Sequence, residues 1–313
     1  MIKKNILIKV SLIILIGFFF TSCAFNSIFL QPWKNKKTDR IFNWKENNDS
    51  ICLKTIGENY QPIFIKNRKD TIHFNFNIES VTFKSTNGNI LNGWFLTPKN
   101  VKPKITILHL HGNAGNLFSQ YNAISPLVEK GMQVFMFDYS GFGYSEGNQN
   151  KENILIDANS ALDYLKTREE IKNTKLVIYG QSIGGHLAVV LAKERETEID
   201  ALVIEGAFSS YNDIGNHYIP LLGGLIIEKS YKAKNIIGQF KKPVLIIHSN
   251  EDKVIPIKMG KKLYNKANEP KQFYEIDGNH INGVVKYSKE ISENLKEQYK
   301  IEYCLSGLYI VKY

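Results

Sequence analysis

The sequence predicts an α/β protein with a mostly parallel central sheet, and three observations lead to this prediction. From residue 105 onward, short apolar runs typical of buried strands alternate with helix-length segments. Polar, glycine-containing turns separate the two kinds of segment. With 313 residues, 43% of them apolar, the chain also has enough apolar material for one sizeable core. Continuous apolar strands separated by helices indicate a parallel sheet covered on both faces.

The first 22 residues have the three-part layout of an export signal. Two lysines precede an apolar run from Val10 to Phe20 that is too short to span a bilayer, and small residues follow before Cys23. Residues 21–24, Thr-Ser-Cys-Ala, resemble the bacterial lipobox, although Phe20 stands where the lipobox usually has leucine. We therefore expect a lipoprotein-type signal peptide over residues 1–22, lipidation of Cys23, and an exported chain held at the membrane of the cell envelope. An uncleaved N-terminal anchor is the alternative.

Charge and cysteine content argue against two other classes of protein. The formal net charge is +10, and removing the three lysines of residues 1–22 leaves +7. The lysines are scattered and do not interleave with aromatic residues, so we expect no nucleic-acid partner, although anionic lipid headgroups could attract them. Beyond Cys23 only Cys52 and Cys304 remain, near the two ends of the body and without metal-ligand spacing. They are expected to be free thiols.

After residue 22 the chain divides into two parts. Residues 23–75 are polar, rich in Asn and Lys and weakly periodic, which predicts a tether and a loosely structured strap rather than a second domain. Residues 76–313 are expected to form the main domain. It opens with a hairpin, because residues 80–98 alternate apolar and polar side chains on both sides of Asn87-Gly88.

Six strands and three helices are then predicted in alternation. The strands are expected at residues 105–112, 132–141, 175–180, 201–208, 243–250 and 272–278, and the helices in a stretch ending near residue 130, at about 153–167 and at 184–193. Ligands of such sheets bind beyond the carboxyl ends of the strands. The loops after the strands are therefore the places to look for chemistry.

Ser182 lies on one of these loops, in the stretch Tyr-Gly-Gln-Ser-Ile-Gly-Gly. A β-prone run ends at Gly180 and a good helix begins near Gly184, so the serine is placed on a strand-to-helix turn. This is the setting of a nucleophile elbow, in which the turn forces an unusual serine backbone and the glycines avoid clashes. A serine hydroxyl needs a base within hydrogen-bond reach, held in turn by a third group.

Asp252 and His280 are the candidates for those two roles. Each follows a predicted strand at its carboxyl end, and the chain order serine, acid, histidine suits this geometry. Loops that follow adjacent parallel strands lie side by side, so the three residues can converge. Glu251, expected to face solvent, and Asp213 are the rival acids. The rival bases, each expected to be structural, are His73, His109, His186, His217 and His248.

The loop after the first apolar run, His111-Gly112-Asn113, is a candidate for stabilising negative charge on a substrate carbonyl. Such a charge needs preorganised N–H donors. We expect one donor from the backbone of Asn113 and the second from that of Ile183, the residue after the serine. No lysine follows in the arrangement of a phosphate-binding loop.

A short insertion, about residues 208–240, is the expected cap. Its apolar centre could form a wall over an acyl-chain pocket or could be an ordinary helix that packs on the domain. The residues that could line a pocket are His111, Gly112, Glu205, Phe208, Tyr218 and Leu221. For Glu205, a structural hydrogen bond is the other interpretation.

Taken together, HGNAGN, DYSGFGYSEG, GQSIGG, the NEDKVIP loop and GNH resemble the α/β-hydrolase superfamily over roughly residues 79–313. They are most similar to its compact serine hydrolases, which include membrane-attached depalmitoylases and relatives of dienelactone hydrolases and prolyl-oligopeptidase domains. The resemblance implies an α/β-hydrolase fold, a Ser182-Asp252-His280 triad, and an oxyanion hole from Asn113 and Ile183.

It further implies cleavage of an ester or thioester in a small acyl ester or acylated substrate, with no metal or organic cofactor. Two departures unsettle the subfamily and the substrate. Ser140 replaces a usual arginine, and Ile281-Asn282 replaces the Asn or Asp that commonly follows the histidine. A peptidase on the same fold and an inactive envelope scaffold are the alternatives.

Overall fold

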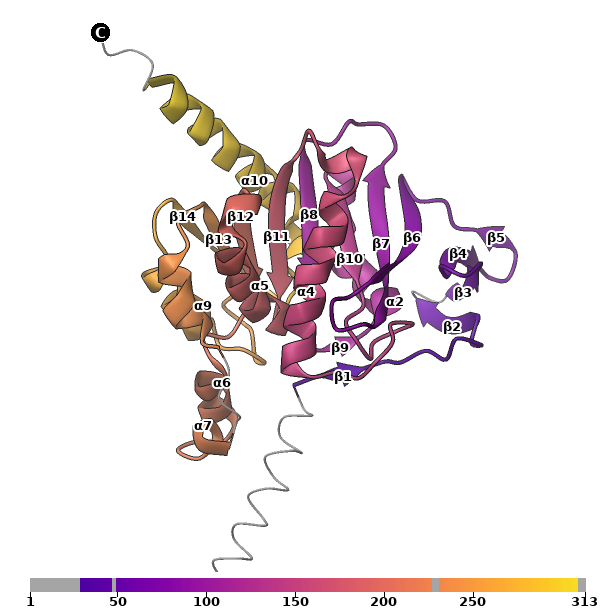
Figure 1. Cartoon of the computed structure of the whole chain (residues 1–313), viewed down its shortest axis with the longest axis horizontal. Helices are drawn as coiled ribbons and strands as arrows, with labels where there is room; N and C mark the ends of the chain where they lie inside the picture. The colour runs from indigo at the N-terminus through magenta and orange to yellow at the C-terminus, as the bar shows by residue number, and fades with distance from the viewer. Residues whose placement is uncertain (1–28, 47–48, 227–230, 309–313) are drawn as a thin grey trace, which may run out of the picture.

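The computed structural model describes residues 29–46, 49–226 and 231–308, and its centre is an eight-stranded sheet (Figure 1). The strand order is β14-β13-β12-β11-β8-β10-β7-β6. The strands from β14 to β10 are parallel to their neighbours, whereas β7 and β6 pair antiparallel at one edge. The predicted α/β fold with a mostly parallel sheet is confirmed.

The predicted strands are present within one to a few residues of the expected ends. The eight strands of the central sheet are β6 Phe76–Lys84, β7 Ile90–Pro98, β8 Ile105–Leu110, β10 Gln133–Phe137, β11 Lys175–Gln181, β12 Ala201–Glu205, β13 Val244–Ser249 and β14 Lys271–Ile276. The hairpin between β6 and β7 turns at Gly88, whose φ of 95° is open to glycine and unfavourable for other residues. The parallel strands β8, β10, β12 and β13 are wholly buried, as their mostly apolar runs predict, whereas the edge strand β14 is mostly half-buried or exposed.

Helices cover both faces of the central sheet. The α-helices are α2 Leu117–Gln120, α3 Pro126–Glu129, α4 Lys151–Lys166, α5 Ile183–Glu194, α6 Tyr211–Tyr218, α7 Gly223–Ile226, α8 Ala233–Ile236, α9 Ile257–Lys266 and α10 Gly283–Leu308, the last with a break in helical geometry at Tyr287. One apolar core joins the sheet to α4, α5 and α9, and a second joins its other face to α3 and α10. Each face therefore has its own core.

The part of the chain before the main domain is more ordered than expected. A four-stranded antiparallel sheet forms from β2 Ile41–Glu46, β3 Asp49–Ile56, β4 Gln61–Lys66 and β5 Asp70–Thr71. Its inner side chains, among them Leu53 and Phe64, join the same core as Trp94 and Tyr121 of the main domain. The prediction of a loosely structured strap is wrong here, because alternate residues of these strands bury apolar side chains.

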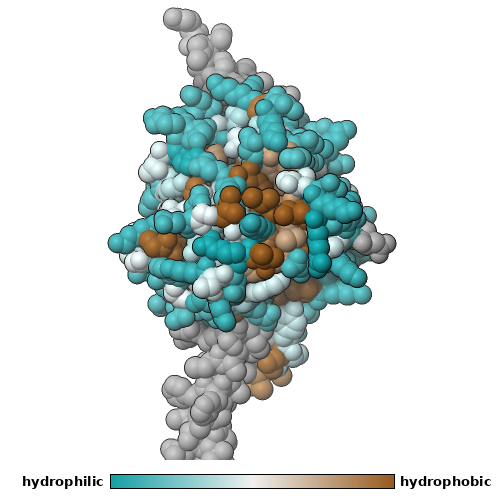
Figure 2. All heavy atoms as spheres, turned by 90° about the vertical axis from the view of Figure 1, so that its right-hand side faces the viewer, coloured by the Kyte–Doolittle hydropathy of each residue, from teal (hydrophilic) through white to brown (hydrophobic). Residues whose placement is uncertain are grey.

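The outer side of this small sheet is partly apolar. Figure 2 looks at this side of the molecule and shows an apolar group surrounded by hydrophilic residues. Ile41 and Ile56 of the small sheet are exposed. Cys52 of β3 is a half-buried free thiol.

The chain enters the fold at the edge where the parallel strands end. A short strand, β1 Gln31–Pro32, pairs parallel with β9 Ala114–Gly115, which follows β8. In Figure 1, β1, β9 and the helices α6 and α7 all lie along the lower edge, toward which β11 points. The expected signal peptide and Cys23 lie outside the described residues. Within the described parts of the chain, every helix is too short or too polar to span a bilayer.

Candidate active site

Ser182 lies on the sharp turn between β11 and α5, as the sequence predicts. Its φ of 57° and ψ of −119° are rare for a residue with a side chain, so this turn is strained. The glycines permit it: a Cβ on Gly180 would lie 2.3 Å from the carbonyl oxygen of Gly184, and one on Gly184 would lie 2.0 Å from that of Leu110. The strand and helix therefore meet closely with the serine hydroxyl at their junction.

His280 and Asp252 lie beside the serine. Nε2 of His280 is 3.0 Å from Oγ of Ser182, and Nδ1 of His280 is 2.7 Å from Oδ2 of Asp252. Because the carboxylate accepts a hydrogen bond from Nδ1–H, Nε2 is left to accept one from the serine hydroxyl. The three residues come from the loops after β11, β13 and β14, so the structure brings together residues that are up to 98 positions apart.

Asp252 is held ionised and in place by the turn on which it lies. Burial alone would raise its pKa, but hydrogen bonds from His280 and from the N–H of Ile255 outweigh burial and lower the pKa below its ordinary value. Its Oδ1 accepts the N–H groups of Val254 and Ile255 at 2.9 and 2.8 Å. These bonds fix the carboxylate so that Oδ2 faces the imidazole.

His248 is a neighbour of this group that the sequence analysis treated only as a structural residue. Its Nε2 lies 2.8 Å from the carbonyl oxygen of Ile255 and 3.5 Å from Oδ2 of Asp252. It is fully buried, and burial lowers its pKa. His248 therefore packs an uncharged ring behind the carboxylate. The four-residue spacing to Asp252 is the signal that could have indicated the contact.

The other candidate bases and acids lie in different surroundings. His109 and His186 are buried, and burial lowers the pKa of each to about 4. Asp213 lies in α6 and forms ion pairs with Lys234 and Lys262. Glu251 is exposed and accepts the N–H of Gly278, and His73 and His217 are also exposed.

The loop 111–113 lies against Ser182, as expected of a loop that supplies a donor. A Cβ on Gly112 would be 3.7 Å from Cβ of Ser182. Among the described residues, the N–H groups of Asn113 and Ile183 have no hydrogen-bond partner. For Ile183 this follows from its place in the first turn of α5, where helical N–H groups are unpaired. Both are therefore free to bind an oxyanion.

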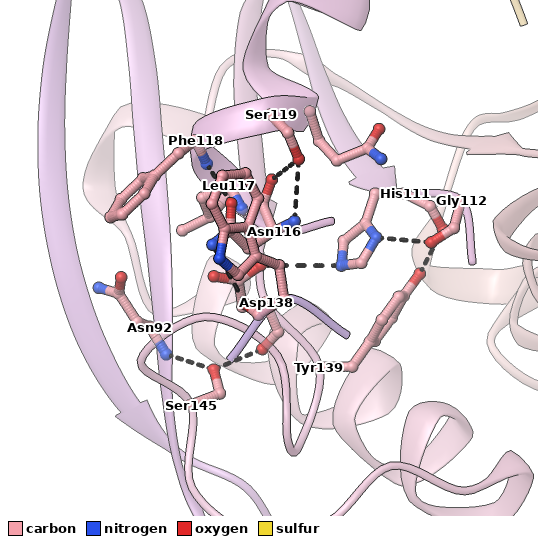
Figure 3. A network of polar contacts seen from close by, with 12 residues as sticks. Asn92, His111, Gly112, Asn116, Leu117, Phe118, Ser119, Asp138, Tyr139 and Ser145 are labelled. Carbon is pink, nitrogen blue, oxygen red and sulfur yellow. Dashed lines mark hydrogen bonds and ion pairs between the residues drawn. The ribbon is translucent and has the colours of Figure 1, made fainter. Parts of the chain in front are cut away.

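A buried polar network holds the loop from behind (Figure 3). Asp138 accepts the N–H of Leu117 at 2.9 Å and lies 3.9 Å from Nε2 of His111. Nδ1 of His111 donates to the carbonyl oxygen of Gly112 at 2.8 Å. The hydroxyl of Tyr139 donates to the main-chain carbonyl oxygen of His111. Burial lowers the pKa of His111 to about 3, so this histidine stays uncharged at neutral pH. His111 is therefore part of the support of the loop, not of an open pocket.

The first described residues also clamp this loop. The N–H of Gln31 donates to the carbonyl oxygen of Asn113 at 2.7 Å, and the N–H of Trp33 donates to the carbonyl oxygen of Gly115 at 2.9 Å. The carbonyl oxygen of Trp33 accepts the N–H of Gly143 at 3.0 Å. A two-residue strand far from the loop in sequence has no signal in the residues themselves, and the sequence analysis missed it.

The six predicted pocket residues do not form one pocket. Glu205 is buried and accepts hydrogen bonds from Tyr179, Gln181 and Gly283, which is the structural role named as its other interpretation. Phe208 is buried and stacks on His186. Gly112 lies beside Ser182, His111 is buried behind it, and Tyr218 and Leu221 are exposed on the cap. The expected apolar wall is not formed by Leu221, because that side chain points to solvent.

A cavity of about 300 Å³ opens instead between α6 and α9. It is lined by Ser209, Asp213, Asn216, His217, Lys258, Met259 and Lys262, mostly polar residues. None of the three residues Ser182, Asp252 and His280 lines it. In the described parts of the chain, no group of three or more His, Cys, Asp or Glu side chains could hold a metal ion.

Comparison with known proteins agrees with the observed fold. A family model described as alpha/beta hydrolase fold matches residues 105–225. The uncharacterized protein YfhR of Salmonella typhi is 40% identical over 217 residues, which make up 65% of this chain and 74% of that protein. The chain belongs to the α/β-hydrolase superfamily.

One further relative supports this membership of the α/β-hydrolase superfamily, and one solved structure has a similar fold. The alpha/beta hydrolase domain-containing protein WAV2 of Arabidopsis thaliana is 32% identical over 206 residues, or 60% of this chain and 66% of that protein. The solved structure of the Pyrococcus furiosus esterase Pf2001 superposes with a TM-score of 0.58 at 18% identity, covering 72% of this chain and 90% of that chain. At that identity the likeness concerns the fold alone.

Proposed function

We propose that this chain is a serine hydrolase that cleaves carboxylic esters or thioesters through an acyl-enzyme. The observation that carries the proposal is the continuous contact from Asp252 through His280 to Ser182, at 2.7 and 3.0 Å. A hydroxyl, an imidazole and a carboxylate in this order can activate the serine at neutral pH. The strained backbone of Ser182 supports the same role, because strain of this kind gathers at functional sites.

The reaction has two steps. Nε2 of His280 takes the proton of Ser182 as Oγ attacks the acyl carbon, and the new oxyanion binds the N–H groups of Asn113 and Ile183. Collapse of this intermediate breaks the bond to the alcohol or thiol, which leaves with the proton from His280. Water then attacks the acyl-enzyme, His280 takes its proton and returns it to Ser182, and the carboxylic acid departs. The steps use only the chain's own groups and water.

An ester or thioester is the proposed substrate class. An activated hydroxyl with two oxyanion donors suits any acyl group, so the arrangement of the three residues does not by itself separate esters from amides. The structurally similar Pf2001 is described as an esterase, which favours esters. Peptide hydrolysis is the alternative to be tested alongside.

We also propose that the chain is exported and held at a bacterial membrane through Cys23. The support is the sequence itself: lysines, an apolar run and Thr-Ser-Cys-Ala at the N-terminus. Labelling with radioactive palmitate tests this, and we expect Cys23→Ala to abolish the label. Retention of the label in that variant would reject lipidation at Cys23.

A fluorophosphonate probe tests the proposed activity. The folded chain is expected to react, and Ser182→Ala is expected to lose the label, because the probe forms a covalent bond to an activated serine. Ser288→Ala, a half-buried serine of α10, is the matched control and should label like the unchanged chain. Labelling that survives Ser182→Ala, or that is absent from the folded chain, would reject a Ser182 hydrolase.

A second assay determines which substrate class the chain hydrolyses fastest. p-Nitrophenyl esters of increasing chain length, an acyl thioester and an aminoacyl amide are compared at one pH. Faster turnover of the esters or the thioester than of the amide supports the proposal. A preference for the amide would favour a peptidase.

A further inference from the structure

The tip of the cap is an exposed apolar group, and it holds the most exposed large apolar side chain among the described residues, Leu221. Helices α6 and α7 form a tight hairpin, in which a Cβ on Gly223 would lie 1.9 Å from the carbonyl oxygen of Gly215. Asn212 donates to the carbonyl oxygen of Gly224, and the N–H of Gly224 donates to the side chain of Asn216. The two helices thus hold the turn between them, residues 219–222, at the outer end of the cap (Figure 1).

Large apolar side chains at this tip face solvent. Leu221 is 89% exposed, Tyr218 55% and Leu222 51%. Leu221 also has a φ of 68°, which is unfavourable for a leucine. A strained, solvated leucine adds nothing to the stability of the free protein. We call Tyr218, Leu221 and Leu222 the cap tip.

The cap tip lies at the edge of the fold where the N-terminal segment joins it. The ring of Phe29, the first described residue, packs against Phe208 and against Tyr211 of α6, with ring centroids 6.3 and 5.3 Å apart. Directly before it lie the 28 residues that contain the apolar run and Cys23. A membrane that holds this segment would therefore be close to the base of the cap.

The cap tip is also tied to the active-site loop and has cations near it. The hydroxyl of Tyr218 donates to the carbonyl oxygen of Val254, two residues after Asp252. Val254 is itself exposed. Lys253 and Lys258, which flank it in sequence, form no ion pair with any described residue. Exposed apolar side chains beside unpaired lysines suit a surface of anionic lipid.

We propose that the cap tip docks into an anionic lipid bilayer, so that the Ser182 site opens toward the membrane and takes acyl substrate from it. Leu221 and Leu222 enter the acyl region, Tyr218 lies at the headgroup level, and Lys253 and Lys258 meet lipid phosphates. This substrate source rests on the proposed hydrolase activity. The docking itself does not, and it can be measured without catalysis.

Quenching by brominated lipid tests the docking. Full-length Ser182→Ala chains are reconstituted in vesicles of brominated phosphatidylcholine and phosphatidylglycerol, with an added tryptophan from Leu221→Trp or, as the matched control, Val101→Trp. Val101 is 57% exposed in the segment between β7 and β8, which leads into the opposite edge of the sheet. We expect the brominated lipid to quench the tryptophan fluorescence that Leu221→Trp adds, but not the fluorescence that Val101→Trp adds. Equal quenching at both positions, or a chain that does not bind the vesicles, would overturn the docking.

Kinetics test the source of substrate. The full-length double variant Leu221→Ser with Leu222→Ser is compared with the unchanged chain on a long-chain ester held in vesicles and on a short, water-soluble ester. We expect the vesicle rate to fall about tenfold or more, because two leucines lose their transfer energy into lipid, with the soluble rate unchanged. An unchanged vesicle rate, or an equal loss on both esters, would overturn membrane uptake. Failure of the hydrolase proposal is recognised separately, because the unchanged chain would then cleave neither ester.

Discussion

The main-chain N–H of Ser182 donates to the carbonyl oxygen of Glu205 at 2.9 Å, so the proposed nucleophile is fixed to the neighbouring strand. The buried carboxylate of the same Glu205 accepts the N–H of Gly283 at 2.6 Å. Gly283 begins α10, three residues after His280. One residue thus joins the turn that carries the serine to the loop that carries the histidine.

The substitution Glu205→Gln should therefore destabilise the fold. The carboxylate accepts three hydrogen bonds, from Tyr179, Gln181 and Gly283, whereas an amide must point its NH₂ group at one or more of these donors. We expect the free energy of unfolding in urea to fall by about 1–3 kcal/mol. In the control Tyr179→Phe the carboxylate keeps two of its donors, so a loss of about 1 kcal/mol is expected. A Gln variant as stable as the unchanged chain would mean that the Glu205 carboxyl is protonated in the fold. Burial raises the pKa of this carboxyl, which favours the protonated form.

Two glycines beside Ser182 should respond differently to alanine. In Gly184→Ala the new Cβ would be 2.0 Å from a backbone oxygen, so we expect a loss of stability of about 3 kcal/mol or more. In Gly112→Ala the nearest atom is 3.7 Å away, so the fold should be kept. The methyl group would crowd the substrate carbonyl, and kcat/KM should fall about tenfold or more. Thermal unfolding measures the effect on stability, and ester hydrolysis measures the effect on activity. Normal activity of the Gly112→Ala variant would mean that the substrate carbonyl does not bind beside Gly112.

The fold and the triad geometry could be predicted because each depends on local patterns. Except for the edge strand β14, the parallel strands are runs of buried, mostly apolar residues, and each of Ser182, Asp252 and His280 follows a predicted strand within a few positions. The topology of a parallel sheet then brings these loop residues to one edge without further information.

The parts that could not be predicted depend on contacts between distant segments. The small sheet β2–β5 is stabilised by burial of Leu53 and Phe64 against side chains of the main domain, which their own polar neighbourhood in sequence does not reveal. The pairing of Gln31 with the loop at Asn113 involves too few residues to form a pattern. The cap was ambiguous because an apolar segment has the same composition whether it is buried, as at Phe208, or exposed, as at Leu221.

The substitution Asp252→Asn should remove activity with little change in the loop. The asparagine oxygen can still accept the N–H groups of Val254 and Ile255, while its NH₂ group faces His280 and favours the tautomer that cannot accept the serine proton. We expect kcat on a soluble ester to fall about 10³- to 10⁴-fold. Circular dichroism should show an unchanged fold. A loss below about tenfold would contradict the role of Asp252 in orienting the imidazole.

Buried histidines should make the protein sensitive to mild acid, and His186 offers the cleanest test. Its two ring nitrogens each lie 3.1 Å from a carbonyl oxygen, of Phe208 and Tyr231, and burial lowers its pKa from 6.5 to about 4. Between those two pH values the unfolded chain binds the proton and the folded chain does not, so stability is full above about pH 6.5 and falls as the pH drops toward 4. The cost from this one residue at pH 5 is about 2 kcal/mol.

The substitution His186→Asn removes the titration but keeps a donor for one carbonyl. Urea unfolding at pH 7.5 and pH 5 should therefore show a drop in the free energy of unfolding that is about 2 kcal/mol smaller in the variant than in the unchanged chain. The difference between the two pH values is compared because the smaller side chain lowers stability at both. His73→Asn, which alters an exposed histidine, should retain the full pH dependence. Parallel losses in His186→Asn and the unchanged chain would show that His186 takes up its proton without unfolding, and the two carbonyl oxygens would then be the groups that hold the charged ring.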